Sequence, residues 1–410
     1  MDYNSSLFRN DQGKDMCGVT YKTYLLKRKI LFWLANRGEM TVAELVRCLN
    51  VSSPTVSKLI ADLIAEGYVR DMGKIETPGG RRPCSYGLIS EAGYFMGVCI
   101  EEQALNIGLI DINRTPVTTR KQIAFSIQND TNTLNALTAK IDEYITEIGI
   151  DKNRILGLGL IFRGRVDSAN SYSYSLLDFD DRPLAQIMQQ KIGIPTIVEN
   201  DTRAMAYAEY MNGETNSEQN ALFINIGRGI GAGIVIGGKL YYGKSGFAGE
   251  FGHIPCFDNE IICHCGKKGC LETEVSGIAL ESKFKKRLEQ GASSILSNKF
   301  NSGKAVTLVD IIDAAKKDDV LSIDLITEIG EKLGRGIGVL INLFNPELVV
   351  IGGLLSEAGD HLMLPIRTAL NKYSLSLVNK DSSLRLSTLG EAASVLGGAL
   401  LTRNSMLDIC

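Results

Sequence analysis

The sequence predicts an α/β chain in which a small basic module of three helices and a hairpin precedes a larger body of alternating strands and helices. Three observations lead to this prediction. Helical and then strand patterns follow one another between residues 21 and 89. From about Ser90 the pattern changes to apolar strands that alternate with helices. The length of 410 residues exceeds one typical domain, which predicts two or three folded units.

The composition predicts a soluble globular protein, with 44% hydrophobic and 22% charged residues. No run approaches the roughly 20 apolar residues of a membrane span, so no membrane partner is expected. The start "MDYNSSLFRNDQGKDMCG" lacks the apolar centre of a secretory signal. The nine cysteines are odd in number, and four of them lie between 256 and 270, which disfavours a disulfide framework. We therefore expect a cytoplasmic protein.

The charge is unevenly distributed along the chain. Residues 21–89 contain eleven Lys/Arg and six Asp/Glu, a net of +5, so the remainder must carry −8 to give −3 for the whole chain. A basic module joined to an acidic body suggests nucleic acid as the partner of the module alone.

The basic module begins with two helical patterns. An apolar stripe over residues 25–35 has the spacing of an amphipathic helix and stops near Gly38. Thr41 can cap a second helix, which ends at about Asn50.

A third helix follows a short turn and runs to about Glu66. Ser53 suits the N-cap, and Pro54 suits the first helical position. The residues expected to face inward are Val56, Leu59, Ile60, Leu63 and Ile64.

Two short strands, "GYVRD" and "CSYGL", follow and are joined by the loop "GKIETPGGRRP". Three helices and a basic-tipped hairpin describe a winged helix-turn-helix whose third helix enters the major groove. The wing would reach phosphates or the minor groove. The alternative is a small helical domain with a solvated basic face. The residues expected to contact DNA are Ser53, Thr55, Ser57, Lys58, Arg81 and Arg82.

The body contains strand ends that suit a sugar- or nucleotide-binding site. "YFMGVCIEEQALNIGLIDIN" predicts a β-hairpin, while "RILGLGLIF" and "PTIVEND" predict buried strands. "NALFINIGRGIGAGIVIGGKLYYG" predicts two strands around a Gly-rich turn, and "GRGIGVLINLFNPELVVIGGLLSE" predicts a helix, a turn and a strand. Glycines let a backbone approach a ligand closely, and carboxylates accept hydrogen bonds from hydroxyls.

Four segments together resemble the successive signatures of the ROK family (repressors, open reading frames, kinases). They are "VENDTRAMAYAE", "NIGRGIGAGIVIGGKLYYGKSGFAGEFGH", "CHCGKKGCLE" and "NPELVVIGG". With the winged helix in front, the chain is similar to the repressor branch, which includes regulators of xylose, N-acetylglucosamine and glucose genes. The resemblance implies an actin-like (ribonuclease H-like, sugar-kinase-type) fold of two lobes with sugar bound in the cleft between them. The expected domains are a polar segment (1–20), the winged helix-turn-helix (21–89) and the sugar-binding domain (90–410).

The resemblance implies a sugar site formed by Asn200, Asp201, Glu250, His253 and Glu272. Convergent carboxylates and amides suit sugar hydroxyls, because charge-assisted hydrogen bonds are the stronger ones. Alternatively, Asn200 and Asp201 only cap the helix that follows, and Glu250 lies in an exposed turn.

The first-lobe loop departs from the family pattern, with "IFRGRVD" in place of "PG" before Val-Asp. Arg163 and Arg165 in this loop suit a phosphorylated sugar or a sugar acid, since guanidinium offers a bidentate fork to such anions. The alternative is that both arginines lie at the surface.

The nucleotide half of a kinase site is expected to be lost. Family kinases hold phosphate with an Asp-x-Gly-Gly-Thr turn, where this chain has "CIEEQ". Glu101 and Glu102 stand for the two glycines, and each carboxylate–phosphate repulsion at about 4 Å costs roughly 1 to 4 kcal/mol. Arg228 replaces a threonine in the second phosphate loop. We expect no catalytic residue, with Asp201 as a vestigial base.

The segment "EFGHIPCFDNEIICHCGKKGCLETE" predicts a zinc site. Cys263, Cys265 and Cys270 form a compact loop whose thiolates can converge, and the resemblance adds His253 as a fourth ligand. Cys256 and His264 are then extras. Four protein ligands leave no open position, so the Zn²⁺ of this loop (253–270) should be structural. The alternative is a loop of reduced cysteines.

The predicted function is a sugar-responsive transcriptional regulator of carbohydrate-utilisation genes, a repressor released by sugar or a sugar derivative. Its expected partners are operator DNA, the sugar and further copies of itself in a homodimer or homotetramer. One alternative is an active ATP-dependent sugar kinase with a DNA-binding head. Another is a zinc-responsive regulator that senses through its cysteines.

Overall fold

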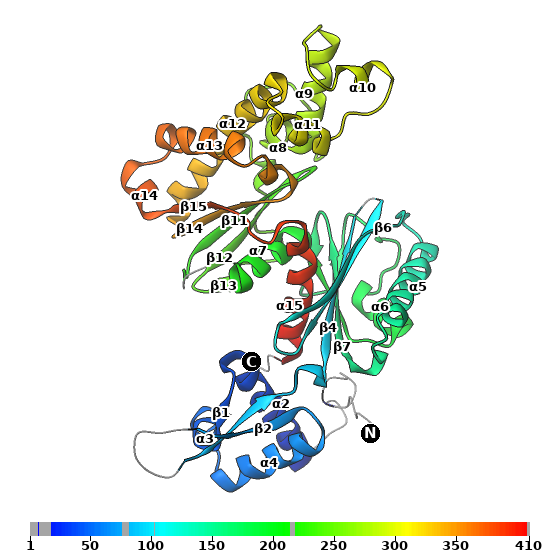
Figure 1. Ribbon diagram of the computed structural model, residues 1–410, viewed down its shortest axis with the longest axis vertical. Helices are drawn as coiled ribbons and strands as arrows, with labels where there is room; N and C mark the ends of the chain where they lie inside the picture. Colours follow the sequence, from blue (N-terminus) through cyan, green and yellow to red (C-terminus); the bar gives the residue numbers. More distant parts are fainter. Residues whose placement is uncertain (1–6, 8–17, 76–81, 102, 214–217, 408–410) are drawn as a thin grey trace. The chain divides into compact units, whose positions relative to one another are not determined.

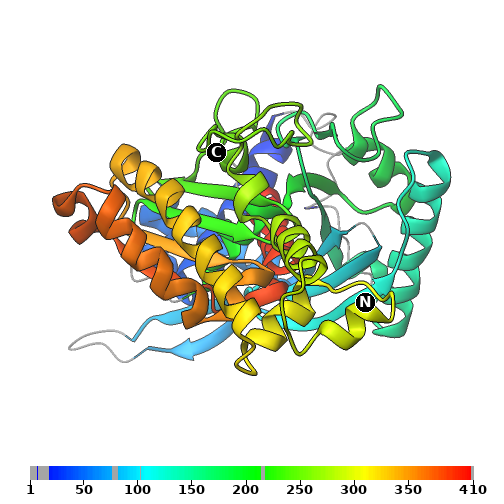
Figure 2. The ribbon, with the colours of Figure 1, turned by 90° about the horizontal axis from the view of Figure 1, so that it is seen from above.

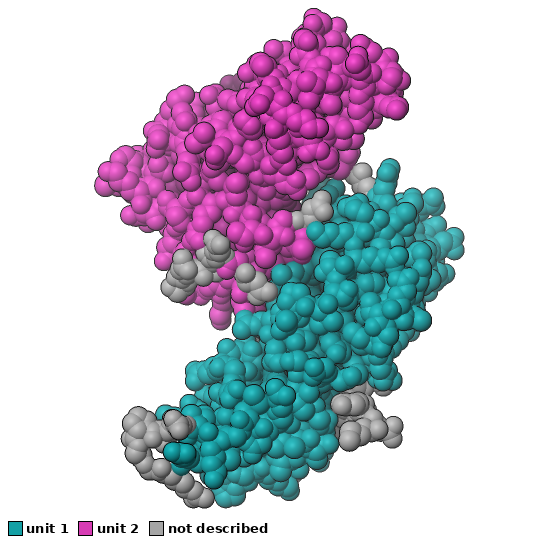
Figure 3. Space-filling model, in the orientation of Figure 1, with its two compact units in different colours: residues 1–204, 394–410 teal, residues 205–393 magenta. Residues whose placement is uncertain are grey.

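The computed structural model describes residue 7 and residues 18–75, 82–101, 103–213 and 218–407. Arg81 and Glu102 therefore lie outside the described residues. The chain divides into two compact units, shown in two colours in Figure 3. The first comprises Met1–Ala204 and Ser394–Cys410, and the second comprises Met205–Ala393. Among the described residues, every helix is too short or too polar to span a lipid bilayer.

Among the described residues of the first unit, three helices come first, as the sequence predicts: α2 (Val19–Arg37), α3 (Val42–Leu49) and α4 (Ser53–Ala65) (Figure 1). Gly38 caps the C-terminus of helix α2, and its φ of 78° suits glycine. The predicted cap at Thr41 is confirmed, because its side chain accepts a hydrogen bond from the Glu44 amide while the Glu44 carboxylate accepts one from the Thr41 amide.

Two details of the predicted third helix are wrong. Ser52, not Ser53, is the N-cap, since its backbone is extended and its hydroxyl accepts a hydrogen bond from the Thr55 amide. Ser53 is already helical, so Pro54 lies within the first turn, where its missing N–H has no intrahelical acceptor to lose. Ile64 is 40% exposed, because the buried stripe runs through the other four predicted residues.

The wing is a hairpin of β2 (Val69–Lys74) and β3 (Cys84–Leu88), as predicted. A third strand, β1 (Met40–Thr41), pairs with β3 and gives the order β1-β3-β2. Two residues are too few to show a strand period in sequence, so β1 was not predicted.

A five-stranded sheet forms the rest of the first unit, in the order β10-β7-β4-β5-β6. Its strands are β4 (Tyr94–Ile100), β5 (Ala104–Asp111), β6 (Pro116–Ala124), β7 (Ile155–Phe162) and β10 (Thr196–Asn200). Strands β4, β5 and β6 run antiparallel, while β4, β7 and β10 run parallel. The predicted hairpin and both predicted buried strands are therefore confirmed. A small pair, β8 (Val166–Asp167) and β9 (Tyr172–Ser173), follows β7.

Helices cover both faces of this sheet. On one face, side chains of α5 (Thr131–Glu147) and α6 (Leu184–Ile192) share a buried apolar cluster with alternate residues of β4, such as Met96 and Val98. On the other, Cys99 and Ile161 pack with Ala204 of α7 (Asp201–Asn212) and Val395 of α15 (Ala393–Leu407), the red helix in Figure 1.

Helix α15 approaches the sheet so closely that only glycine fits at the contact. A Cβ atom on Gly97 would lie 2.0 Å from the Val395 carbonyl oxygen, and one on Gly159 would lie 2.6 Å from that of Gly398. These obstacles are backbone atoms, which cannot rotate away. The absent side chains of β4 and β7 thus fix the path of α15.

The second unit contains a sheet in the order β13-β12-β11-β14-β15. Its strands are β11 (Ala221–Ile226), β12 (Ile230–Ile236), β13 (Lys239–Leu240), β14 (Leu348–Gly352) and β15 (Ser383–Leu386). Its helices are α8 (Glu272–Val275), α9 (Gly277–Glu289), α10 (Ser297–Asn301), α11 (Leu308–Ala315), α12 (Val320–Phe344), α13 (Asp360–Tyr373) and α14 (Ser376–Asp381).

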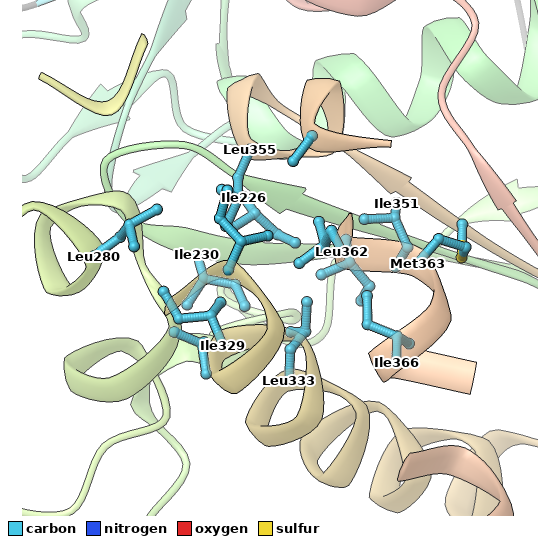
Figure 4. Packing of buried hydrophobic residues seen from close by; sticks show 14 of the residues in the cluster. Ile226, Ile230, Leu280, Ile329, Leu333, Ile351, Leu355, Leu362, Met363 and Ile366 are labelled. Atoms are coloured by element: carbon cyan, nitrogen blue, oxygen red, sulfur yellow. The ribbon is translucent and has the colours of Figure 1, made fainter. Parts of the chain in front are cut away.

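The core of the second unit lies between this sheet and its helices. Figure 4 shows Ile226, Ile230 and Ile351 of the strands facing Ile329 and Leu333 of α12. Figure 2 shows α12 and α13 side by side, and glycines of α12 allow this approach: a Cβ on Gly334 would lie 2.6 Å from the Ala369 Cβ.

The two sheets repeat one pairing pattern. In the first sheet, β4, β5 and β6 pair antiparallel, and β4 also pairs parallel with β7, which pairs parallel with β10. In the second sheet, β11, β12 and β13 pair antiparallel, and β11, β14 and β15 pair parallel in the same way. Two units with this repeated sheet form the actin-like, sugar-kinase-type fold that the sequence predicts.

The close contact between α15 and the sheet predicts that one methyl group added at Gly97 strongly lowers the stability of the protein. We expect Gly97→Ala to lower the free energy of unfolding by about 3 kcal/mol, at the upper end of overpacking costs, measured by urea titration. The control is Gly227→Ala, where a Cβ would meet no atom within 4 Å, and which should change stability by less than about 0.5 kcal/mol. Equal effects of the two substitutions would contradict the packing argument.

Candidate functional sites

The exposed face of α4 carries the predicted DNA-contacting residues. Ser53, Thr55, Ser57 and Lys58 are all exposed, whereas Val56 between them is buried. The Thr55 hydroxyl lies 2.8 Å from that of Ser52 at the helix start. In the wing, Arg82 is exposed. The structure thus leaves the polar face of this helix available to a partner.

Three strands of the first unit end level with one another. Ile100 pairs with Phe162, and Phe162 pairs with Asn200, in two parallel ladders. The carboxyl ends of parallel strands are where open α/β sheets bind ligands. The residues that follow these ends are Glu101, Arg163 and Asp201.

These neighbours act on one another electrostatically. Burial raises the pKa of the Asp201 carboxyl, and the Arg163 guanidinium opposes that rise. Burial, together with the carboxylates of Asp201 and Glu101, also raises the pKa of the Cys99 thiol. Arg163 is half-buried at this edge, whereas Arg165 is exposed.

The Asn200 side chain makes three hydrogen bonds within the fold, one of them donated to the adjacent Asp201 carboxylate (3.1 Å). Its side-chain oxygen accepts one from the Arg203 amide (3.0 Å), which makes it a cap for α7. Its side-chain nitrogen donates to the Gly164 carbonyl (2.9 Å) and so holds the loop that contains both arginines. Asn200 therefore does cap the following helix, and the same contacts orient its amide at the strand edge.

A buried ion pair beneath this turn was not predicted. Arg203 donates to the Glu199 carboxylate (2.7 Å), and both side chains are almost inaccessible to solvent. Arg203 also donates to the Val166 carbonyl, and Ser168 donates to Glu199. The spacing of four residues across a strand–helix junction carries no pattern that marks such a pair. The Arg203–Glu199 ion pair stabilises the turn that contains Asn200 and Asp201.

In the second unit, four predicted metal ligands converge. One ligand atom from each of His253, Cys263, Cys265 and Cys270 lies within 4.8 Å of every other, a spacing that fits a shared metal ion. The Sγ atoms of Cys265 and Cys270 are 3.6 Å apart, and the Cys263 Sγ lies 3.5 Å from Nδ1 of His253. Cys256 is half-buried and lies outside this group.

The two ring nitrogens of His253 face different neighbours. While Nδ1 faces the cysteines, Nε2 lies 3.7 Å from the exposed carboxylate of Glu250. The short helical turn Phe251–His253 joins these residues. Glu250 thus lies in an exposed turn, as the second alternative expected, but beside the imidazole of a cluster residue.

Glu272 borders the cluster at the start of α8. One of its oxygens accepts a hydrogen bond from the Ile230 amide (3.1 Å). The other lies 2.9 Å from Nδ1 of His264, which is exposed but is not remote from the cluster. His253, His264 and Glu272 form a second group that could hold a metal ion.

A charge network centred on the buried Glu274 contacts the cysteine loop. The Glu274 carboxylate accepts hydrogen bonds from Lys283 (2.9 Å), Lys332 (2.6 Å) and the loop residue Asn259 (2.7 Å). Both lysines also donate to Glu328. Burial favours the neutral form of Glu274, but the hydrogen bonds from Lys332 and Lys283 prevail and lower its pKa to about 2.

A winged helix-turn-helix ahead of an actin-like body defines the class of this protein. A family model described as "ROK family" matches residues 96–405, and one described as "MarR family" matches residues 29–82. The chain belongs to the ROK family.

Several relatives align over nearly the whole chain. The xylose repressor of Caldicellulosiruptor bescii is 30% identical over 364 residues, which cover 88% of this chain and 91% of the relative. A solved ROK family transcriptional regulator, described as a homologue of the Escherichia coli Mlc protein, superposes with a TM-score of 0.78 at 26% identity, covering 93% of this chain and 96% of its own. A ROK family glucokinase from Streptomyces griseus, solved with glucose and AMPPNP, superposes with a TM-score of 0.68 at 29% identity and covers 76% and 100%.

The Glu274 network predicts a pH-dependent stability. Because the pKa of Glu274 is about 2 in the fold and 4.5 ordinarily, its contribution is complete above about pH 4.5 and is lost as the pH falls toward 2. We expect Glu274→Gln to destabilise the metal-free protein by about 3 kcal/mol at pH 7, and the difference to shrink below pH 4.5.

Urea titrations of both proteins from pH 7 to pH 3, with chelator present, measure this difference. The control is Glu289→Gln on the same second unit, whose carboxylate is half exposed and 3.8 Å from Lys285, and which should cost less than about 0.5 kcal/mol. A Glu274→Gln difference that is constant with pH would contradict the assignment.

Proposed function

We propose that this protein is a transcriptional repressor of carbohydrate-utilisation genes that binds operator DNA through its winged helix and is released by a sugar. The main support for this proposal is the share of this chain that each relative covers. The xylose repressor and the solved transcriptional regulator align with head and body together, whereas the glucokinase covers 76% of this chain. The DNA contacts are those of the α4 face, with Arg81 and Arg82 from the wing. Two heads in a homodimer or homotetramer would fit half-sites about one helical turn apart.

The proposed sugar contacts are Asn200 and Asp201 of the first unit and Glu250, His253 and Glu272 of the second. Oriented amides, carboxylates and an imidazole are the groups that sugar hydroxyls need. A sugar that binds one conformation of the protein more tightly shifts the population toward it, and this differential affinity is the source of the response. Arg163, half-buried at the strand edge, suits a phosphorylated sugar or a sugar acid.

The same strand edge gives reasons to expect no phosphoryl transfer. The Glu101 amide, which a phosphate loop would turn toward its ligand, donates to the Ala104 carbonyl (2.9 Å). The Glu101 carboxylate accepts a hydrogen bond from Asn106 (3.0 Å) and adds negative charge where a triphosphate would lie. The second candidate, an active sugar kinase with a DNA-binding head, draws on the similarity to the glucokinase solved with AMPPNP.

We assign the cluster of His253, Cys263, Cys265 and Cys270 to a structural Zn²⁺. Three thiolates and one imidazole are a common zinc ligand set, and four protein ligands leave no position for a reactive water. Bound through Nδ1 of His253, the metal would fix the ring so that Nε2 points toward Glu250 and the sugar.

Operator binding and ADP release together test this function. We expect an operator selected from random DNA to be bound tightly without sugar and at least about tenfold more weakly with D-xylose, D-glucose or N-acetylglucosamine in a gel-shift titration. A coupled ADP assay with Mg-ATP and the same sugars should remain at background. Lys58→Ala serves as the control with weakened DNA binding and an unchanged sugar melting shift. Sugar-dependent ADP release would instead support the kinase candidate, and unchanged operator affinity with a full sugar panel would refute the repressor.

A second prediction concerns the metal. We expect the purified protein to contain about one zinc ion per chain, and Cys265→Ser to lose both the zinc and the sugar-induced melting shift. Elemental analysis and thermal unfolding measure the two effects. Cys256→Ser, in the same loop but outside the ligand group, should keep both. A Cys265→Ser protein without zinc that still binds sugar would show that the metal does not position the sugar contacts.

A further inference from the structure

Helix α15 begins where the chain returns from the second unit to the first, between Ala393 and Ser394. The outward crossing lies between Ala204 and Met205 in α7. The two crossings are in backbone contact within the first unit: a Cβ atom on Gly397 would lie 1.7 Å from the Ala204 carbonyl oxygen. The two crossings are therefore packed directly against each other, with no side chain between them at this contact.

The other end of α15 is attached to the DNA-binding head by Arg403. This side chain is only 2% exposed, and it is the one charged residue of the helix. Its Nε donates to the Ile112 carbonyl (2.7 Å), just beyond β5, and one Nη donates to the Ala35 carbonyl (2.9 Å) in α2. A buried guanidinium is costly unless its donors are used, so these two bonds define the position of the side chain.

The acceptor in α2 is a helix-end carbonyl. The last four carbonyls of a helix lack intrahelical donors, and Ala35 belongs to that last turn of α2. The Gly38 amide satisfies the Leu34 carbonyl, and Arg403 satisfies the next one. Its positive charge also lies at the negative end of the helix dipole.

The contact is reciprocal. Arg28 of α2 donates to the Met406 carbonyl, which lies in the last turn of α15. Arg28 is further oriented by Tyr24, since its guanidinium lies 5.7 Å from the centre of that ring. Each helix thus has a C-terminal carbonyl capped by an arginine from the other, an arrangement that ties the two helix ends in position and direction.

We propose that α15 transmits the state of the junction between the two units to the DNA-binding head, with Arg403 and Arg28 as its positioning residues. This inference rests on the proposed function and names its regulatory connection. A helix of 15 residues is a rigid rod of about 22 Å. Its first turns are held by the contacts of Gly397 and Gly398, and its last turn holds α2. A sugar-dependent change at the junction therefore moves the head as one body with α15.

The test uses the full chain with Arg403→Lys and Arg28→Lys, which keep the charge but lose the guanidinium fork. Operator affinity is measured by fluorescence anisotropy without sugar and with D-xylose, D-glucose or N-acetylglucosamine. We expect a wild-type affinity ratio of at least about 10 to fall toward 1 in both variants, while the sugar melting shift is unchanged. The matched control is Arg367→Lys, whose guanidinium donates to the Leu384 carbonyl in the second unit, and which should keep the wild-type ratio.

A second measurement decides the inference without sugar. Operator binding should slow hydrogen exchange in α15 and near residue 204 of the wild type, because coupling between sites is reciprocal. In the two variants, operator should protect α4 and the wing but not α15. Variants that keep the wild-type affinity ratio, or a wild type whose α15 exchange ignores operator, overturn the inference. A wild type that lacks the sugar response but shows operator protection of α15 instead refutes the proposed function alone. If Arg403→Lys fails to fold, the half-buried Arg28 decides the outcome.

Discussion

The first unit depends on a backbone-to-backbone contact between α15 and the sheet. Gly97 and Gly159 remove the side chains that would hold the helix away, and Gly397 does the same toward α7. Because the obstacles are carbonyl groups, the helix can pack on the strands in only one position. In that position Arg403 reaches α2, and Val395 lies beside Cys99 behind the strand edge. The position of the head on the first unit and the packing behind Asp201 are thus two results of one steric constraint.

In both units, a buried carboxylate with its cationic partners holds the segment that carries candidate ligand-binding groups. In the first, Glu199 and Arg203 hold the turn that carries Asn200. In the second, Glu274 and its two lysines hold the loop that carries the cysteines. A buried ion pair is weak support for stability in general, because desolvation offsets the attraction. Its value here is geometric, since many hydrogen bonds at defined angles orient groups that a ligand meets.

The sequence was sufficient for most of the head helices, for the buried strands and for the His/Cys cluster. Apolar periodicity located the head helices and the buried strands, and the spacing of three cysteines within eight residues marked the cluster. It was insufficient wherever the partner is distant. Arg403 and Ala35 are 368 residues apart, and no local period connects them. The one available signal was a single charge in the apolar helix "ASVLGGALLTRNSML". The N-cap at Ser52 was missed because two adjacent serines are equally good caps, and only backbone geometry distinguishes them.

The path of the chain also sets an order of assembly. The first unit is made of residues before 205 and after 393, with the whole second unit encoded between them. During synthesis, the head and its sheet emerge first but lack the helix that fills one face and caps α2. Until about 190 further residues have been translated, that face is open and the end of α2 has no arginine partner. A chain interrupted anywhere in the second unit would lack α15, so the DNA-binding head would lose its arginine contact. It would also expose an apolar sheet face that quality-control proteases and chaperones can recognise.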